Sequence, residues 1–394
     1  MDDNGKGSKR QRVLQVDEVL LYEGGEIAEE RRREITRVRT GPQVRIIPYG
    51  AFQGCINLAE VHFDERMEII GASAFSGCVA LRQVTIPSSV TELGDRAFYY
   101  CSNLAKVQFD EGSALEIFAE NVFGGCWSLR SVTLPSSVTI LRSWAFYKCV
   151  NLARVQLNDG LQDIGGHAFH GCTALRNVTI PSSVTKLGDQ TFCKCTNLTE
   201  VIFLGGKRLL NKGFLERGLF SGQGVLNRQT LDTMVTSNGY GRNAFRDSPL
   251  ADIKISISRA LSDRMILLPQ KCRLSIEGRI RDLSIGRIRY LRRLELARDL
   301  TILACFPFVR SSGKFHVQDT ENQTAESVHK VLRLISFHEL KESSILIELA
   351  MWKSRLDEHR ARADCRASIP DPAKSLIMEY CGFTDFLKPV IEGD

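Results

Sequence analysis

Residues 74–98 read AFSGCVALRQVTIPSSVTELGDRAF, and versions of this stretch recur through the first half of the chain. Each copy contains a phenylalanine followed three residues later by a cysteine. This pair occurs seven times, at Phe52/Cys55, Phe75/Cys78, Phe98/Cys101, Phe123/Cys126, Phe146/Cys149, Phe169/Cys172 and Phe192/Cys195. Successive phenylalanines lie 23 residues apart, except for one step of 25. Such a period predicts a solenoid, in which each unit buries its apolar face by stacking on its neighbours.

Each repeat is predicted to contain one short strand. The segment 83–86 alternates polar and apolar residues, which is the pattern of a half-buried strand, and similar segments follow in the later repeats. Strands stacked in this way predict a parallel sheet along the solenoid axis. A glycine precedes the next Ala-Phe in several repeats, and we expect it to permit a close or a left-handed backbone. These glycines are Gly71, Gly94, Gly165 and Gly188.

The turn after the strand alternates between two kinds, so the true period is a pair of repeats. Pro-Ser-Ser-Val stands at residues 87–90, 135–138 and 181–184, and proline there removes an N–H donor where the strand must end. The other turns are acidic. They contain Asp64-Glu65, Asp110-Glu111 and Asn158-Asp159.

The pattern A-F-x-G-C-x-x-L-x-x-V-x-I-P-S-S-V-T-x-L-G-x-x-A-F resembles the BspA-like type of leucine-rich repeat over residues 38–203. The resemblance implies an α/β fold, a curved right-handed leucine-rich-repeat solenoid with its parallel strands on the concave face and Phe and Cys packed inside. It also implies a binding or adhesion module without catalytic activity. A mainly helical C-terminal region is expected to follow the solenoid.

The chain divides by composition into six predicted segments. The C-terminal one resembles the tails of a large family of diatom leucine-rich-repeat proteins, with helical spacing in residues 328–335 and 345–356 and a last helix over residues 372–380. Residues 291–303 fit either a divergent repeat or an amphipathic helix that runs into a strand. The segments are a disordered N-terminus (1–12), an N-terminal cap (13–37), the solenoid (38–204), an irregular Gly-rich segment (205–243), a degenerate repeat with a basic amphipathic region (244–310), and the helical region (311–394).

Catalysis, cofactors and metals are not expected. The chain contains no phosphate-binding G-x-x-x-x-G-K-[ST] loop, no G-x-G-x-x-G, no H-E-x-x-H and no G-x-S-x-G. Seven of the twelve cysteines share one repeat position, which predicts a ladder of buried thiols rather than disulfides. Cys193 and Cys195 near His167 and His170 form a weaker candidate for a metal site.

No apolar segment has the length of a signal sequence or of a membrane span, which predicts an intracellular, cytoplasmic protein. An extracellular adhesion protein, which the resemblance also allows, would need a start site upstream of Met1. The sequence gives no indication of the oligomeric state.

The strongest candidate surface lies on the solvent side of the strands, where a positive side chain occurs at or next to the first strand position in five consecutive repeats. Strands about 4.8 Å apart would align these charges over roughly 20 Å. Either they pair with the turn acids Asp64, Glu65, Asp110, Glu111 and Asp159, or they bind an acidic partner. The predicted partner-binding residues are Arg82, Gln83, Lys106, Gln108, Arg130, Arg154, Gln156 and Arg176.

The predicted function is therefore a non-enzymatic protein–protein interaction module that binds a partner on the concave face. The alternative is nucleic-acid or anionic-surface binding through the basic region 271–298, which contains eight arginines and three acidic residues. No aromatic platform or nucleic-acid motif accompanies that region, so the protein partner is favoured over nucleic acid.

Overall fold

The computed structural model describes residues 19–210, 226–235, 243–257, 264–283, 294–297, 301–311, 314–317 and 323–357. The chain forms two compact units. The first comprises residues 1–209, 226–255 and 307–318, and the second comprises the remainder. The predicted disordered segment 1–12 and the predicted helix 372–380 lie outside the described residues.

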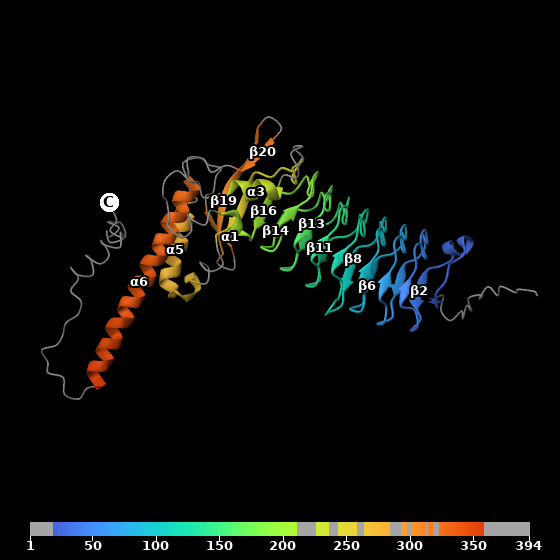
Figure 1. The fold of residues 1–394 in the computed structure, drawn as a ribbon, viewed down its shortest axis with the longest axis horizontal. Helices are drawn as coiled ribbons and strands as arrows, with labels where there is room; N and C mark the ends of the chain where they lie inside the picture. The colour runs from blue at the N-terminus through green and yellow to red at the C-terminus, as the bar shows by residue number, and fades with distance from the viewer. Residues whose placement is uncertain are drawn as a thin grey trace, which may run out of the picture. The chain divides into compact units, whose positions relative to one another are not determined.

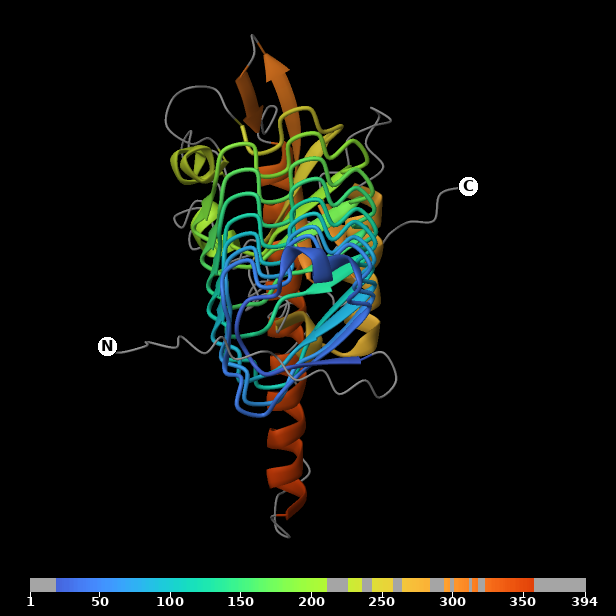
Figure 2. The ribbon, with the colours of Figure 1, turned by 90° about the vertical axis from the view of Figure 1, so that its right-hand side faces the viewer.

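The first unit is a parallel β-solenoid, which confirms the predicted fold (Figure 1). Most coils contribute one longer strand and one strand of two residues, and Figure 2 shows successive coils lying over one another. The longer strands are β1 (Val19–Tyr22), β2 (Arg37–Thr40), β4 (Glu60–His62), β6 (Gln83–Ile86), β8 (Lys106–Phe109), β10 (Ser131–Thr133), β12 (Arg154–Gln156), β14 (Asn177–Ile180), β16 (Glu200–Phe203) and β17 (Asp252–Ser256). The short strands are β3 (Ile46–Ile47), β5 (Ile69–Ile70), β7 (Glu92–Leu93), β9 (Ile117–Phe118), β11 (Ile140–Leu141), β13 (Asp163–Ile164) and β15 (Lys186–Leu187).

The hydrogen bonding of the longer strands follows the two-repeat period. The short strands form one continuous seven-stranded sheet, whereas the longer strands are bonded in the groups β1-β2-β4, β6-β8, β10-β12 and β14-β16-β17. Within residues 19–210, the ladder is interrupted after β4, β8 and β12. These are the strands followed by the acidic type of turn, so the alternation seen in the sequence also divides the sheet.

Hydrogen bonds between the two kinds of turn follow the same alternation. Ser89 Oγ donates to the carbonyl oxygen of Met67 at 2.6 Å, and Ser137 Oγ donates to that of Leu115 at 2.7 Å. Asn158, which lies in the acidic kind of turn, donates from Nδ2 to the carbonyl of Pro135 in the preceding Pro-Ser-Ser-Val turn at 2.6 Å. The second serine of Pro-Ser-Ser therefore satisfies a carbonyl of the preceding, acidic-turn repeat.

A column of stacked phenylalanine rings forms the core. Their centroids are 5.0 to 5.7 Å apart, and neighbouring planes differ by no more than 13°. Tyr22 packs edge-on against Phe52 at 4.9 Å and covers the N-terminal end of the column. At the other end, Phe245 stacks on Phe192, and β17 pairs in parallel with β16. The rings of the column are Phe52, Phe75, Phe98, Phe123, Phe146, Phe169, Phe192 and Phe245.

The repeated cysteines are buried thiols, as predicted, and each of the described cysteines is free. From the second repeat onward, the thiol donates to the carbonyl oxygen of the phenylalanine one repeat earlier, as Cys101 Sγ does to Phe75 at 3.1 Å. The same carbonyl accepts the N–H of Cys78 within its own repeat. Burial raises the pKa of Cys101 to about 12, so the thiol remains protonated at neutral pH.

Two backbone positions in each Phe turn are left-handed, which the sequence analysis did not anticipate. One is the second residue before the phenylalanine, and the other is the residue before the cysteine. Glycine fills the second position at Gly54, Gly77, Gly125 and Gly171, whereas other repeats place a larger residue there. In successive repeats, the first position is occupied by Gly50, Ser73, Arg96, Asn121, Trp144, His167 and Gln190.

The sequence predicted either a close approach or a left-handed backbone at the glycines before Ala-Phe. At Gly94 and Gly188 the structure shows a close approach between the backbones of neighbouring coils. A Cβ at Gly94 would lie 2.3 Å from the backbone nitrogen of Ala72, and one at Gly188 would lie 2.2 Å from that of Gly166. Neither glycine has a positive φ. These residues allow the backbones of successive coils to contact each other directly.

The N-terminal part of this unit contains a parallel pair and one turn of 3-10 helix. β1 pairs with β2, and the predicted cap segment also contains the 3-10 helix η1 (Glu29–Arg33). Two short helices, α1 (Gly206–Leu209) and α3 (Arg228–Val235), follow β16.

The second unit contains α5 (Gln270–Leu283), β18 (Leu294–Leu296), the first residues of β19 (Ile302–Ser311) and α6 (Gln323–Asp357). Arg264 forms an ion pair with Glu339 of α6 and also donates to Ser336 Oγ at 3.2 Å. The remaining part of β19 pairs antiparallel with β20 (Lys314–Val317) within the first unit. Among the described helices, none combines the length and apolar character that a membrane span requires.

One sequence interpretation of this region was wrong and another was confirmed. Residues 291–303 were expected to form a divergent repeat or a helix that runs into a strand, but β18 pairs antiparallel with β19. The helical spacing predicted for residues 328–335 and 345–356 is confirmed, and both stretches belong to the single 35-residue helix α6. The linking residues 336–344 include neither Gly nor Pro, so nothing interrupts the helix.

We predict that Gly94→Ala destabilises the solenoid by about 3 kcal/mol, because the new Cβ would overlap the backbone of the preceding coil. Gly112→Ala is the matched control. Gly112 has a φ of +74° but open space around its Cβ position, so only backbone strain of about 1 kcal/mol is expected. Urea unfolding measures both values, and equal losses in the two variants would contradict the close-approach role of Gly94.

Candidate interaction surfaces

All eight predicted partner-binding residues are exposed on the solvent side of the longer strands, here called the strand face. Arg82, Arg130 and Arg176 immediately precede β6, β10 and β14, whereas Lys106 and Arg154 are the first residues of β8 and β12. The five cations, here called the basic ribbon, therefore alternate between two adjacent backbone positions. This stagger again has a period of two repeats.

The three predicted glutamines lie beside the ribbon in register with neighbouring strands. Gln83 is opposite Lys106 in the β6–β8 ladder, and Gln108 is opposite Thr85. Gln156 is opposite Thr133, whose hydroxyl lies 3.4 Å from the Gln156 carboxamide oxygen. The ribbon is thus bordered by an uncharged strip in which Thr and Gln alternate.

The basic ribbon makes no internal ion pairs with the described residues. Within the described parts of the chain, none of its five side chains lies within salt-bridge distance of a carboxylate. Ion pairs do occur on the same face at both ends of the ribbon. Arg37 lies 3.7 Å from Glu60, and Lys254 lies 3.0 Å from Glu200.

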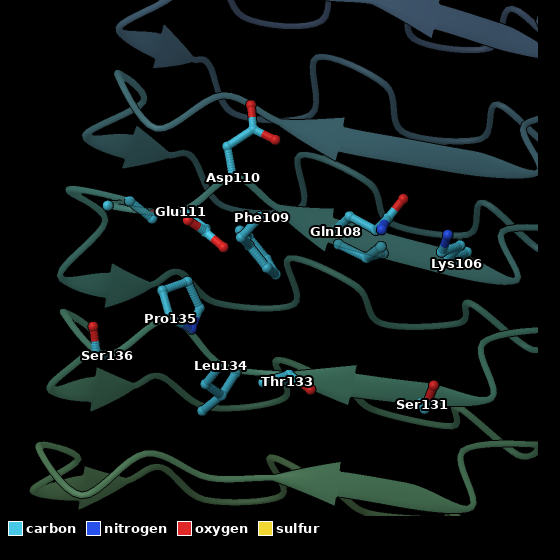
Figure 3. Close-up of a pocket in the computed structure, with 13 residues that line it drawn as sticks. Lys106, Gln108, Phe109, Asp110, Glu111, Ser131, Thr133, Leu134, Pro135 and Ser136 are labelled. Carbon is cyan, nitrogen blue, oxygen red and sulfur yellow. The ribbon is translucent and has the colours of Figure 1, made fainter.

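The turn acids cannot neutralise the ribbon because they lie at the opposite ends of the strands. Figure 3 shows Lys106 at the start of β8, with Asp110 and Glu111 beyond its end. Four residues of strand separate the two ends by about 13 Å. The hypothesis of pairing with the turn acids is therefore not supported by the described residues.

Two pockets open on the strand face, each at an interruption of the sheet. The larger, of about 500 Å³, lies between β8 and β10 and is lined by Lys106, Thr133 and the turn that follows β8 (Figure 3). The smaller, of about 230 Å³, lies between β4 and β6 and is lined by residues that include Glu60, His62 and Thr85. These pockets could receive side chains of a partner that lies across the strands.

The predicted alternatives lack a comparable arrangement. Within the described residues, no three potential metal ligands come together, and Cys195 Sγ instead donates to the carbonyl of Phe169. In the basic region 271–298, α5 buries Cys272 and Ile276 and exposes Lys271. Residues 284–293, which contain four of that region's arginines, lie outside the described part.

A second surface, formed by the Phe turns of four consecutive repeats, was missed by the sequence analysis. Tyr100 and Trp127 are 39% and 46% exposed, and the other rings are half-buried. This aromatic surface consists of Tyr99, Tyr100, Trp127, Trp144, Tyr147, His167 and His170. The residues occupy several different positions of the repeat, so no single sequence column reveals them.

The rings of the aromatic surface contact one another in two sets. Tyr100 packs edge-on against Tyr99 at 4.4 Å and against Trp127 at 6.1 Å. In the other set, Trp144 stacks on His167 at 3.9 Å. Tyr147 lies edge-on to Trp144 at 4.9 Å.

The histidines of this surface are close enough to influence each other. His167 Nδ1 and His170 Nδ1 lie 3.3 Å apart. Burial, together with the positive charges of His167, Lys194 and Lys148, lowers the pKa of His170 to about 4 against an opposing effect of Asp247. His170 is therefore neutral at physiological pH.

The comparisons with known proteins agree with the fold. The profile of the BspA type leucine-rich repeat region matches residues 31–151, 116–217 and 144–262, with six copies. These ranges together cover more than half of the chain, so the chain belongs to this family. Its fold is generally used for protein interaction and is typically non-enzymatic. No match was found among the curated proteins.

Several solved structures resemble the chain in part. A leucine-rich repeat protein from Bacteroides ovatus is 29% identical, with a TM-score of 0.39, and the match covers 46% of this chain and 53% of that protein. The chain thus spans about half of that relative. The T. pallidum leucine-rich repeat protein is 30% identical over 41% of this chain and 77% of its own, with a TM-score of 0.37. A leucine-rich cell surface protein from Faecalibacterium prausnitzii is 20% identical over 53% and 66%, with a TM-score of 0.33.

We predict that His170 makes the stability of the chain pH-dependent. The pKa of His170 is about 4 in the folded chain and 6.5 without burial, so below about pH 6.5 the unfolded chain binds a proton that the folded chain does not bind. The free energy of unfolding should therefore fall as the pH decreases from about 6.5 to about 4. His170→Tyr, which places the equivalent residue of the preceding repeat here, should reduce this decline. Urea unfolding across that pH range measures it, and an unchanged profile would contradict the assignment.

Proposed function

We propose that this protein is a non-enzymatic interaction module whose strand face binds an acidic protein partner along the basic ribbon from Arg82 to Arg176. The observation that carries the proposal is the absence of internal ion pairs along the ribbon within the described residues. Like charges in successive coils repel one another, and a partner's carboxylates would relieve that repulsion.

The ends of the ribbon support a site of defined length. Arg37 and Glu60 precede it, and Glu200 and Lys254 follow it, each as an ion pair on the same face. The cations at these ends are already paired, so they would add no net charge attraction for an acidic partner. The five unpaired cations extend over roughly 20 Å, which suits a segment of a folded or extended partner.

The polar strip and the pockets would supply specificity. Charge complementarity raises the association rate and selects partners by sign, whereas close packing and hydrogen bonds set the lifetime of a complex. The pocket between β8 and β10 adjoins Lys106, so a partner held by the ribbon can insert a side chain there. The amides of Gln108 and Gln156 offer both donors and acceptors beside the charges.

The proposal is tested by charge reversal. Intact chain and an Arg130→Glu/Arg154→Glu variant are used to capture proteins from a lysate, and the captured proteins are quantified by mass spectrometry. We expect the variant to lose the acidic partners by about tenfold or more, and we expect high salt to weaken their capture by the parent chain.

The matched control changes the net charge equally but away from the ribbon. Arg142 and Lys186 are exposed and lie in or next to the short-strand sheet, so Arg142→Glu/Lys186→Glu should retain the partners. The proposal fails if the ribbon variant retains every specific partner. It also fails if the control variant loses the same proteins, since net charge alone would then explain binding.

A further inference from the structure

The smaller pocket of the strand face, between β4 and β6, differs in charge from the larger one. Three carboxylates line it, and none of its described lining residues is Lys or Arg. They belong to Glu60 of β4, Glu65 of the turn after β4, and Asp110 of the turn after β8. The larger pocket also contains turn acids, but Lys106 lies at its other end (Figure 3). The smaller one is therefore the more negative, and is here called the acidic pocket.

Two of these carboxylates have no cation of their own. Glu65 and Asp110 are exposed, and neither forms an ion pair with a described residue. Glu60 is partly neutralised, since its carboxylate lies 3.7 Å from Arg37 Nε and 2.9 Å from His62 Nε2. An acidic side chain in the pocket would be repelled by uncompensated like charge, whereas a cationic one would be attracted.

A cation with a long apolar stem fits the acidic pocket better than a metal ion does. Among the described residues, no three potential metal ligands come together, so the carboxylates do not form a common coordination site. Phe63 and Pro87 line the same pocket and can pack against methylene groups. The Gln83 carboxamide and the Thr85 hydroxyl add further acceptors. Lys and Arg side chains combine such a stem with several N–H donors that can reach separate acceptors.

The acidic pocket adjoins the N-terminal end of the basic ribbon. Gln83, which lines the pocket, directly follows Arg82, the first cation of the ribbon. The strand face therefore changes sign at this point. A partner whose acidic residues lie along the ribbon meets the opposite requirement when it continues across the pocket.

We propose that the acidic partner inserts a lysine or arginine side chain into the acidic pocket, next to the acidic segment that lies along the basic ribbon. The proposal rests on the proposed function and adds a requirement to it, namely a basic residue at the end of the partner's acidic segment nearest to β4. Opposite charges at neighbouring places on the face would also fix the direction in which the partner lies.

The test uses the full chain and synthetic peptides of about twelve residues in which Glu alternates with Ser, with an extended length of about 40 Å. One terminal residue is Arg, Gln or Glu, and each peptide is made with this residue at the N-terminus or at the C-terminus. Fluorescence anisotropy measures the dissociation constants. For one of the two termini, we expect the Arg peptide to bind about fivefold or more tightly than the Gln peptide, and the Glu peptide to bind most weakly.

Two variants locate the effect in the pocket. Glu65→Gln/Asp110→Asn removes the two unpaired carboxylates and should abolish the preference for Arg over Gln. Glu92→Gln/Glu116→Gln changes the net charge equally, at exposed residues in or next to the short-strand sheet, and should retain the preference. All four side chains are exposed, so the thermal unfolding midpoints should stay within a few degrees of the parent's. Because the preference is a ratio of two dissociation constants, a general change in attraction for acidic peptides cancels.

Two results would overturn the proposal. The Arg and Gln peptides could bind the parent equally tightly at both termini, or the pocket variant could keep the preference for Arg. In either case, binding of the acidic peptides would leave the proposed function standing. If instead no acidic peptide binds more tightly than an all-Ser peptide, the proposed function and the role of the pocket both fail.

Discussion

The carbonyl oxygen of the repeated phenylalanine holds each coil to the next. It accepts the N–H of the cysteine three residues later and, in most repeats, the thiol of the cysteine in the following coil. Because both donors are buried, a displacement of the coils that broke either bond would leave that donor without a partner. Cysteine meets this requirement as a small apolar residue that also donates. The stacked rings, the left-handed turn positions and the close glycines all follow from this arrangement.

This constraint fixes the backbone of the Phe turn but leaves its outward side chains free to vary. The two left-handed positions hold Gly, Ser or Asn in some coils and Tyr, Trp, Lys or His in others. The strand face varies in the same way, since its inward Val residues are buried or half-buried while most of its outward residues are exposed. The solenoid therefore presents two independent surfaces, one cationic and one aromatic, on a common core.

Much of the fold was predictable because its determinants are local and repeated. The Phe/Cys period gave the solenoid, and the alternating turns gave the two-repeat unit. The left-handed positions were not predictable from the sequence, because a left-handed backbone is normally indicated by glycine. Some repeats have other residues at these positions, such as Trp144 and Lys148. The aromatic surface was missed because its rings occupy several different positions of the repeat. The pairing of β18 with β19 depends on contacts outside any repeat, which short apolar runs do not encode. The continuity of α6, by contrast, agrees with the lack of Gly and Pro in residues 336–344.

For the strand face, the sequence predicted the basic ribbon but left its pairing open. The structure separates the ribbon from the turn acids by the length of a strand, so the charges should repel one another in the isolated chain. The direct measurement is the free energy of unfolding of the parent and of Arg130→Gln/Arg154→Gln at about 0.01 M and about 1 M salt, where the Debye length falls from about 30 Å to about 3 Å. An unpaired ribbon predicts that the variant is at least as stable as the parent at low salt and that any difference disappears at high salt. A variant that is less stable at low salt would show that the ribbon is paired internally, and would contradict the account.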